Sequence, residues 1–161
     1  MSEYDKNPHA PNGKQSKLIK ITEYLKKLPN ITDEQFHQHW NSTHVNIAMK
    51  SPLFRKHVRY YNQFHITPED RALAAKLGPV LEYDGVVELW MDSMEDWEAI
   101  VADKEFLATI FPDEKKFLQT PVQFMIGRDT LVIPYNESNE DAKDMRIKTG
   151  RESEPAEACI P

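Results

Sequence analysis

The sequence predicts a single α+β domain whose elements follow the order β-α-β-β-α-β. Short runs rich in β-branched and aromatic residues, which are typical of strands, alternate with longer segments whose apolar residues recur at helical spacing. The chain has 161 residues, which fit one domain of this kind and leave little room for a second core.

The first strand is expected over residues 17–25, a β-rich run that a turn-prone Leu-Pro-Asn segment follows. The first helix should begin at Thr32, because the side chains of Thr32 and Gln35 can each accept a hydrogen bond from the other's backbone amide. Its buried face is formed by residues at helical spacing, namely Phe36, Trp40, His44 and Ile47. The helix should end or kink before Pro52.

The second strand is expected over residues 58–66, which alternate and are rich in aromatic side chains. One of its faces carries Arg59, Tyr61, Gln63 and His65. The other face carries Val58, Tyr60, Asn62, Phe64 and Ile66. Residues 67–79 form a connection that tolerates a short helix and is the expected lid or variable loop.

The third strand, residues 86–91, is apolar on both faces apart from Glu88, which predicts a central position in the sheet. The second helix should begin after Ser93, and its continuation should bend at Pro112. The last strand is expected over residues 122–133.

This order is the ferredoxin-like arrangement, in which two helices cover one face of an antiparallel sheet. The other face is left bare, and a bare sheet face with aromatic and aliphatic side chains is expected to be buried on a partner. We therefore expect a homodimer in which sheet packs against sheet. The domain should span residues 17–135, between a flexible N-terminal segment, 1–16, and a polar C-terminal tail, 136–161.

Composition excludes several classes of protein. A net charge of −6 opposes a general affinity for nucleic acid or for anionic lipid. No stretch is long and apolar enough to cross a membrane, and residues 1–16 lack the apolar core of a secretory signal. The one cysteine, Cys159, excludes an intrachain disulfide and a thiolate metal cluster. These features predict a cytoplasmic protein that binds neither nucleic acid nor membranes.

Motifs for metal and cofactor binding are missing from the sequence. Its few glycines form neither the dinucleotide-binding motif nor a phosphate-binding loop. His37 and His39 are two residues apart on the expected helix and so point about 200° apart, which prevents them from holding one metal ion together. If the protein is an enzyme, acid–base catalysis without a metal or a cofactor is the chemistry that remains.

Three segments carry a resemblance to a known family: Phe36–Trp40 followed by His44, Arg59–His65, and Tyr83–Trp90. Together they resemble the EthD-like family of dimeric α+β-barrel proteins, over residues 18–133. Within that family the arrangement is most similar to the cofactor-free decarboxylases of fungal aromatic polyketide pathways, which act on anthrone-type acids. The resemblance implies a metal-independent carboxy-lyase of secondary metabolism whose substrate is an aromatic polyketide carboxylic acid.

On this resemblance, His44 or His65 is expected to be the catalytic acid that delivers a proton to the carbon that loses CO₂. The residues expected to bind the substrate are Phe36, Trp40, Arg59, Tyr61, Gln63, Glu88 and Trp90. Arg59 is the expected cation for the substrate carboxylate, and the aromatic rings should enclose its flat rings. Glu88 either orients a histidine or pairs with Arg59 in a structural ion pair.

Other interpretations of the same residues remain open. His44 can be a structural histidine bonded to a backbone carbonyl, and the strand face with Tyr61 and His65 can instead meet the dimer partner. His39 is expected to be exposed. The same fold and residues also suit a polyketide cyclase or dehydratase, an anthrone oxygenase, or a non-catalytic dimeric module that binds an aromatic ligand.

Overall fold

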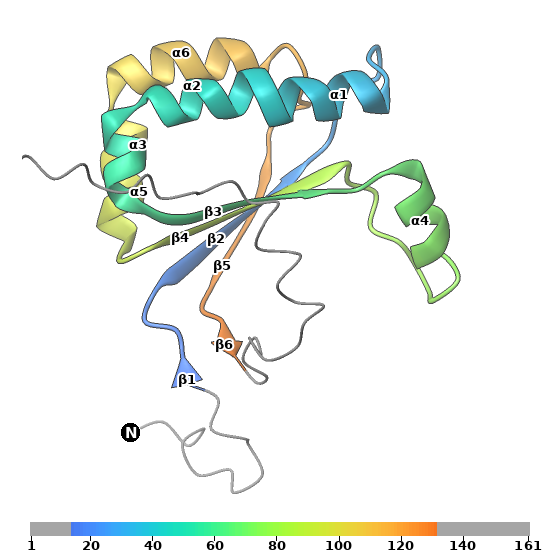
Figure 1. Ribbon diagram of the computed structural model, residues 1–161, viewed down its shortest axis with the longest axis horizontal. Helices are drawn as coiled ribbons and strands as arrows, with labels where there is room; N and C mark the ends of the chain where they lie inside the picture. The colour runs from blue at the N-terminus through green and yellow to red at the C-terminus, as the bar shows by residue number, and fades with distance from the viewer. Residues whose placement is uncertain (1–13, 132–161) are drawn as a thin grey trace, which may run out of the picture. The chain divides into compact units, whose positions relative to one another are not determined.

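Four antiparallel strands form the sheet of the protein in the order β3-β4-β2-β5, and helices cover one of its faces (Figure 1). The computed structural model describes residues 14–131. The strands of this sheet are β2 (Ile19–Leu25), β3 (Val58–His65), β4 (Gly85–Met91) and β5 (Gln123–Gly127). The arrangement is the ferredoxin-like fold, so the predicted fold is confirmed.

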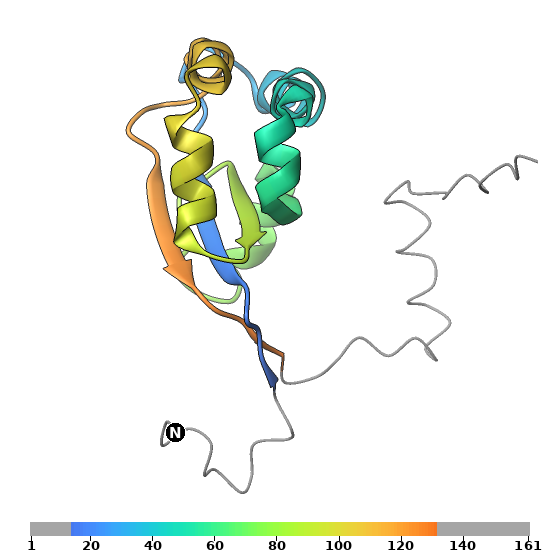
Figure 2. The same ribbon diagram turned by 90° about the vertical axis from the view of Figure 1, so that its left-hand side faces the viewer.

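The helical layer comes from the connections that follow β2 and β4. Its elements are α1 (Asp33–His39), a π-helix η2 (Trp40–His44), α2 (Val45–Lys50), α3 (Pro52–His57), α5 (Met94–Ala102) and α6 (Lys104–Glu114). Figure 2 shows α3 beside α5 and α2 beside α6 in this layer. A separate helix, α4 (Pro68–Ala74), lies in the connection from β3 to β4. None of the helices within residues 14–131 is long and apolar enough to span a bilayer.

Local chemistry sets the ends of most elements. Thr32 forms the predicted capping box with Gln35 at the start of α1. The first helical segment ends at Lys50, and Ser51 caps a new helix that has Pro52 in its first turn. The last strand is shorter than predicted, because β5 ends at Gly127.

Two short strands, β1 (Lys14–Gln15) and β6 (Thr130–Leu131), pair with each other. The expected C-terminal tail, 136–161, and most of the expected N-terminal segment, 1–16, lie outside the described residues. The predicted limits of the domain therefore stay predictions.

The strand register decides which face of β3 lies under the helices. The buried side chains of the central strand β4 face the helical layer and include Val87 and Leu89. Tyr61 pairs with Leu89, and Gln63 pairs with Val87. Because paired residues share a face of the sheet, the side chains of Tyr61 and Gln63 also face the helices.

The opposite face of the sheet leaves aromatic side chains exposed. Tyr60 is 58% exposed and Phe64 is 56% exposed on this uncovered face. Val58 was expected beside them, but the register shifts between Val58 and Tyr60, and this irregularity turns Val58 toward the core. The homodimer through the uncovered face stays a prediction, which the molar mass of the protein in solution would test.

Candidate active site

A partly open cavity of about 430 Å³ is lined by residues of the helical layer, of the covered face of the sheet and of the segment between α6 and β5. Much of its wall is apolar and includes Phe54, Val87, Leu89, Trp97, Phe106 and Ile110. The ionisable side chains that line it are Glu23, His44, Tyr61, Glu114 and Lys115. A concave, mostly apolar site with a few polar groups is typical of the binding of a small organic molecule.

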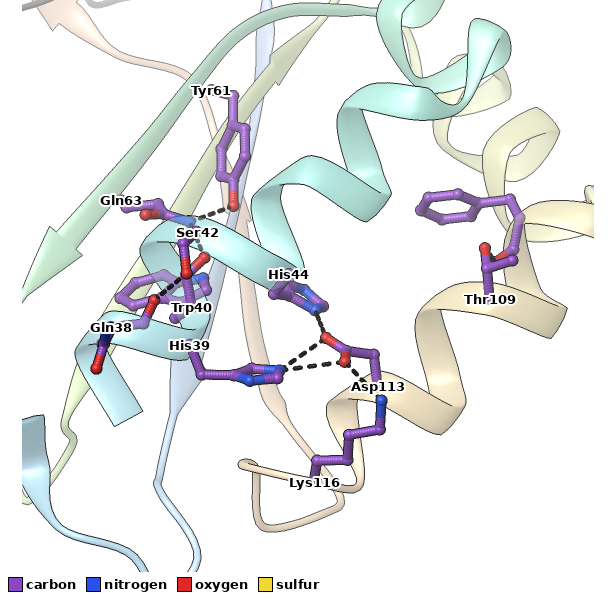
Figure 3. A network of polar contacts seen from close by, with 11 residues as sticks. Gln38, His39, Trp40, Ser42, His44, Tyr61, Gln63, Thr109, Asp113 and Lys116 are labelled. Atoms are coloured by element: carbon purple, nitrogen blue, oxygen red, sulfur yellow. Dashed lines mark hydrogen bonds and ion pairs between the residues drawn. The ribbon is translucent and has the colours of Figure 1, made fainter. Parts of the chain in front are cut away.

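A polar contact beside this cavity joins His44, which lines it, to Asp113. His44 is the last residue of η2, and Asp113 lies on α6 with only 1% of its surface exposed. The His44 Nδ1 atom lies 3.0 Å from Asp113 Oδ2 (Figure 3). When Nδ1 donates this hydrogen bond, Nε2 of the neutral ring is an acceptor. Nε2 makes no hydrogen bond to any residue of 14–131, so it is free to accept a proton from a molecule in the cavity.

Within residues 14–131, the carboxylate of Asp113 accepts hydrogen bonds from three side chains, those of His39, His44 and Lys116. His39 Nε2 lies 3.1 Å from both carboxylate oxygens, and Lys116 Nζ lies 3.2 Å from Oδ1 (Figure 3). Burial alone would raise the pKa of Asp113, but the hydrogen bonds from His39, His44 and Lys116 outweigh it and lower the pKa. Asp113 is therefore an ionised carboxylate that fixes the ring of His44.

The π-helix explains how His39 and His44 reach the same carboxylate. In an α-helix, residues five apart point about 140° away from each other. The wider π-helical turn, with its i→i+5 hydrogen bonds, brings such residues onto one side. The expectation of an exposed His39 is therefore wrong, since 25% of its side chain is exposed and its ring contacts Asp113.

The surroundings of His44 favour the neutral form of its ring. Burial is the largest influence and lowers its pKa below the ordinary value, although Asp113 opposes the change. A neutral imidazole with one nitrogen fixed and the other free is the arrangement of a general base.

Tyr61 offers a hydrogen-bond donor to the same cavity. Burial raises the pKa of the Tyr61 phenol to about 12, so the hydroxyl keeps its proton. Its oxygen accepts a hydrogen bond of 2.8 Å from Gln63 Nε2 (Figure 3). The phenolic proton can therefore be donated to an oxygen atom of a ligand.

Two carboxyl groups complete the polar lining. Burial, with the nearby charge of Glu114, raises the pKa of Glu23 to about 7. Burial, with the nearby charge of Asp113, raises the pKa of Glu114 to about 7. Both groups can therefore carry a proton near neutral pH, which an ordinary glutamate does not.

Sequence reasoning missed Glu23, Asp113 and Glu114. The sequence does contain a signal for Glu23. It lies two residues from both Ile21 and Leu25, which are buried, so its side chain is on the same face of β2 as theirs. Nothing local marks Asp113 or Glu114 as a site residue, since the two histidines that contact Asp113 lie 69 and 74 positions away in the sequence.

Of the predicted site residues, the structure brings His44 and Tyr61 together at the cavity, with Gln63 behind Tyr61. Phe36 and Trp40 are 0% exposed and belong to the core instead of the cavity wall. His65 lies elsewhere, with its Nδ1 atom 2.8 Å from Nδ1 of His37.

Three other predicted residues are also separate from this cavity. Arg59 pairs with Asp92 at the surface. Trp90 donates a 2.6 Å hydrogen bond to Asp129. Glu88 faces the uncovered side of the sheet, where its ion pair is with Lys20, so the expected pair with Arg59 is not formed.

A larger hollow of about 630 Å³ lies over the uncovered face of the sheet. At this hollow Lys20 is paired with Glu88, and Arg71 with Asp84, whereas Arg128 forms no ion pair with any residue of 14–131. The smaller cavity is the stronger candidate for a catalytic site, because it is lined by a histidine whose Nδ1 is fixed by a buried carboxylate, whereas no histidine lines the larger hollow. In the described part of the chain, no group of three or more His, Cys, Asp or Glu side chains could hold a metal ion.

Comparison with known proteins identifies the family of the chain and finds relatives that are named as enzymes. The model of the EthD domain matches residues 28–121. The chain belongs to the EthD domain family. The resemblance drawn from the sequence is therefore confirmed at the level of the family.

Two relatives of this EthD-domain protein are named as dehydratases. It is 33% identical to "Dehydratase CTB10" of Cercospora beticola over 112 residues, 65% of this chain and 83% of the relative. It is 26% identical to "Conidial pigment biosynthesis dehydratase EthD" of Metarhizium robertsii over 134 residues, 80% of this chain and 87% of the relative. Dehydratases are lyases that release water and not CO₂. The names of these relatives therefore contradict the prediction of a carboxy-lyase, although they stay within the class of lyases.

A solved structure supports the fold alone. The crystal structure of HapK from Hahella chejuensis is 11% identical and has a TM-score of 0.50, over 74% of this chain and 99% of that chain. At this distance, similarity of fold carries no information about the reaction.

Proposed function

We propose that this EthD-domain protein is a dehydratase of secondary metabolism that removes water from a cyclic β-hydroxy ketone of the aromatic polyketide type. The observation that carries the proposal is the His44 ring, which is fixed by Asp113 through Nδ1 and has a free Nε2 at an apolar cavity. The names of the two relatives support the same class of reaction.

In this proposal, His44 Nε2 removes the proton from the carbon between the carbonyl group and the carbon that bears the hydroxyl group. Tyr61 donates its phenolic proton in a hydrogen bond to the carbonyl oxygen, where negative charge develops. The electron pair of the broken C–H bond forms the new C=C bond. The C–O bond to the hydroxyl group breaks, and the departing oxygen needs a proton to become water.

The charges around the cavity favour a neutral substrate. Asp113 is ionised beside His44, and Glu23 and Glu114 gain negative charge when they lose their protons. Lys115 is the one lysine or arginine among the residues that line the cavity, and its side chain is exposed. A carboxylate substrate would be repelled here, because Arg59, the cation expected to bind it, lies outside the cavity.

The test uses a β-hydroxytetralone, a bicyclic β-hydroxy ketone whose dehydration and tautomerisation give a naphthol. Mass spectrometry should show that the wild-type protein removes one molecule of water from it faster than buffer does. Val101→Trp should reduce kcat/KM by about tenfold or more, because Val101 lines the cavity and the larger indole ring would occupy space that the substrate needs. Val101 is 38% exposed, so the fold can accommodate the tryptophan.

The matched control is Leu77→Trp, because Leu77 is 92% exposed and lies outside this cavity. Its kcat/KM should equal that of the wild type. An unchanged substrate mass with wild-type protein would overturn the proposed reaction for this class of substrate. Equal kcat/KM values for both tryptophan variants would instead overturn the location of the site.

A further inference from the structure

Glu23 occupies an unusual place for a carboxyl group. It pairs with Val87 on one side and Phe124 on the other, and its side chain lines the cavity. Among the described residues, none forms a hydrogen bond or an ion pair with the carboxyl group of Glu23. A carboxylate in apolar surroundings without a partner is unfavourable, so the group is stabilised by holding a proton.

The ionisable groups that share the cavity with Glu23 do not supply a counter-charge in contact with it. Glu114 and Lys115 come from the C-terminal end of α6, His44 from η2 and Tyr61 from β3. The neighbouring strands β4 and β5 contribute only uncharged side chains to the cavity. When Glu114 is ionised, its negative charge further disfavours loss of the proton from Glu23.

We propose that Glu23 is the catalytic acid that protonates the departing hydroxyl group, and that Glu114 is a positioning residue that keeps Glu23 in its acid form. The inference rests on the proposed dehydration and assigns the proton source that this reaction needs. His44 acts as the base on the same substrate, so the two proton transfers use different groups in one cavity.

The step is balanced in atoms and electrons. The carbon-bound proton passes to His44 Nε2, and the C–H electron pair becomes the second bond of the new C=C. The C–O electron pair stays on oxygen, which takes the proton of Glu23 and leaves as water. His44 is then protonated and Glu23 is ionised, and transfer of one proton from His44 to Glu23 through water restores both groups.

The pH dependence follows from the directions of the two pKa changes. Glu23, whose pKa is raised to about 7, is an acid only below that value, so activity should fall as the pH rises through it. His44, whose pKa is lowered, is a base only above that pKa, so activity should fall as the pH drops through it. The profile of kcat/KM should therefore be bell-shaped.

The experiment compares two leaving groups on the same tetralone ring. Hydroxide needs an acid to leave, whereas fluoride is a weak base and leaves without one. Glu23→Gln should reduce kcat/KM for the β-hydroxytetralone by about 10²–10⁴-fold. On the β-fluorotetralone, the same variant should retain activity within about tenfold of the wild type.

Three further variants keep the outcomes distinct. Glu114→Gln should move the alkaline limb of the profile to lower pH, because the pKa of Glu23 falls when the neighbouring charge is removed. Glu105→Gln, an exposed carboxyl on α6 outside the cavity, should leave rate and profile unchanged. Glu23→Asp should recover part of the activity on the hydroxy compound.

An equal loss on both leaving groups would overturn the role of Glu23 as an acid and indicate a structural role. Unchanged activity of Glu23→Gln on the hydroxy compound would overturn it as well. Failure of the proposed function is distinguishable, because wild-type protein would then eliminate neither water nor fluoride.

Discussion

Replacing Asp113 by Asn should lower kcat/KM for the loss of water by about 10²–10⁴-fold in a protein that still folds. The substitution keeps the size of the side chain but removes the charge that His44, His39 and Lys116 contact. An amide presents either its oxygen or its NH₂ group to His44. The tautomer that leaves His44 Nε2 free to accept a proton is therefore no longer enforced.

The pH profile gives this variant a second readout. Asp113 raises the pKa of His44 against the effect of burial, so its replacement should lower that pKa further. The acid limb of kcat/KM should then move to lower pH. Asp92→Asn is the control, since Asp92 is an exposed carboxylate paired with Arg59 outside the cavity. A wild-type rate and profile for Asp113→Asn would show that the contact with His44 has no catalytic role.

Replacing Gly85 by Ala should destabilise the protein by about 1–3 kcal/mol, because the core has no room for the added methyl group. A Cβ atom on Gly85 would lie 2.9 Å from Cη2 of Trp40 and closer still to Cζ3. Trp40 is 0% exposed and packs against Phe36, so its ring cannot move away without disturbing other core residues.

Denaturant unfolding measures this effect as a change in midpoint at constant slope. Gly127→Ala is a matched control in β5, since a Cβ there meets nothing within 4 Å. Its free energy of unfolding should stay within about 0.5 kcal/mol of the wild type. Equal stability of the two variants would contradict the close packing of Trp40 on β4.

The fold could be predicted from the sequence because its signals are local. The capping box of Thr32 and Gln35 and the cap at Ser51 depend on residues within one helical turn. The π-helix over Trp40–His44 was not predicted, because the apolar spacing of an α-helix continues through it. The shift of Val58 toward the core was missed for a related reason, since a bulge leaves the residue types of a strand unchanged.

The candidate site could be predicted only in part. His44 and Tyr61 stand out as polar residues on elements that must be buried, and both line the cavity. The alternation of residue types along a strand shows which side chains share a face. It does not show which of the two faces the helices cover. Glu88 was predicted as a site residue and Glu23 was not considered, although Glu88 faces the uncovered side and Glu23 lines the cavity. The contact of Asp113 with His44 spans 69 positions of sequence and arises only in the folded chain.

The role of His44 as the base is tested most directly by hydrogen exchange at carbon. Unsubstituted α-tetralone has the acidic C–H group but no hydroxyl group to lose, so exchange with D₂O reports proton removal alone. Wild-type protein should introduce deuterium beside the carbonyl group faster than buffer does, and Glu23→Gln should retain this exchange. His44→Gln should exchange only at the buffer rate, whereas exchange by this variant at the wild-type rate would contradict a base at His44 Nε2.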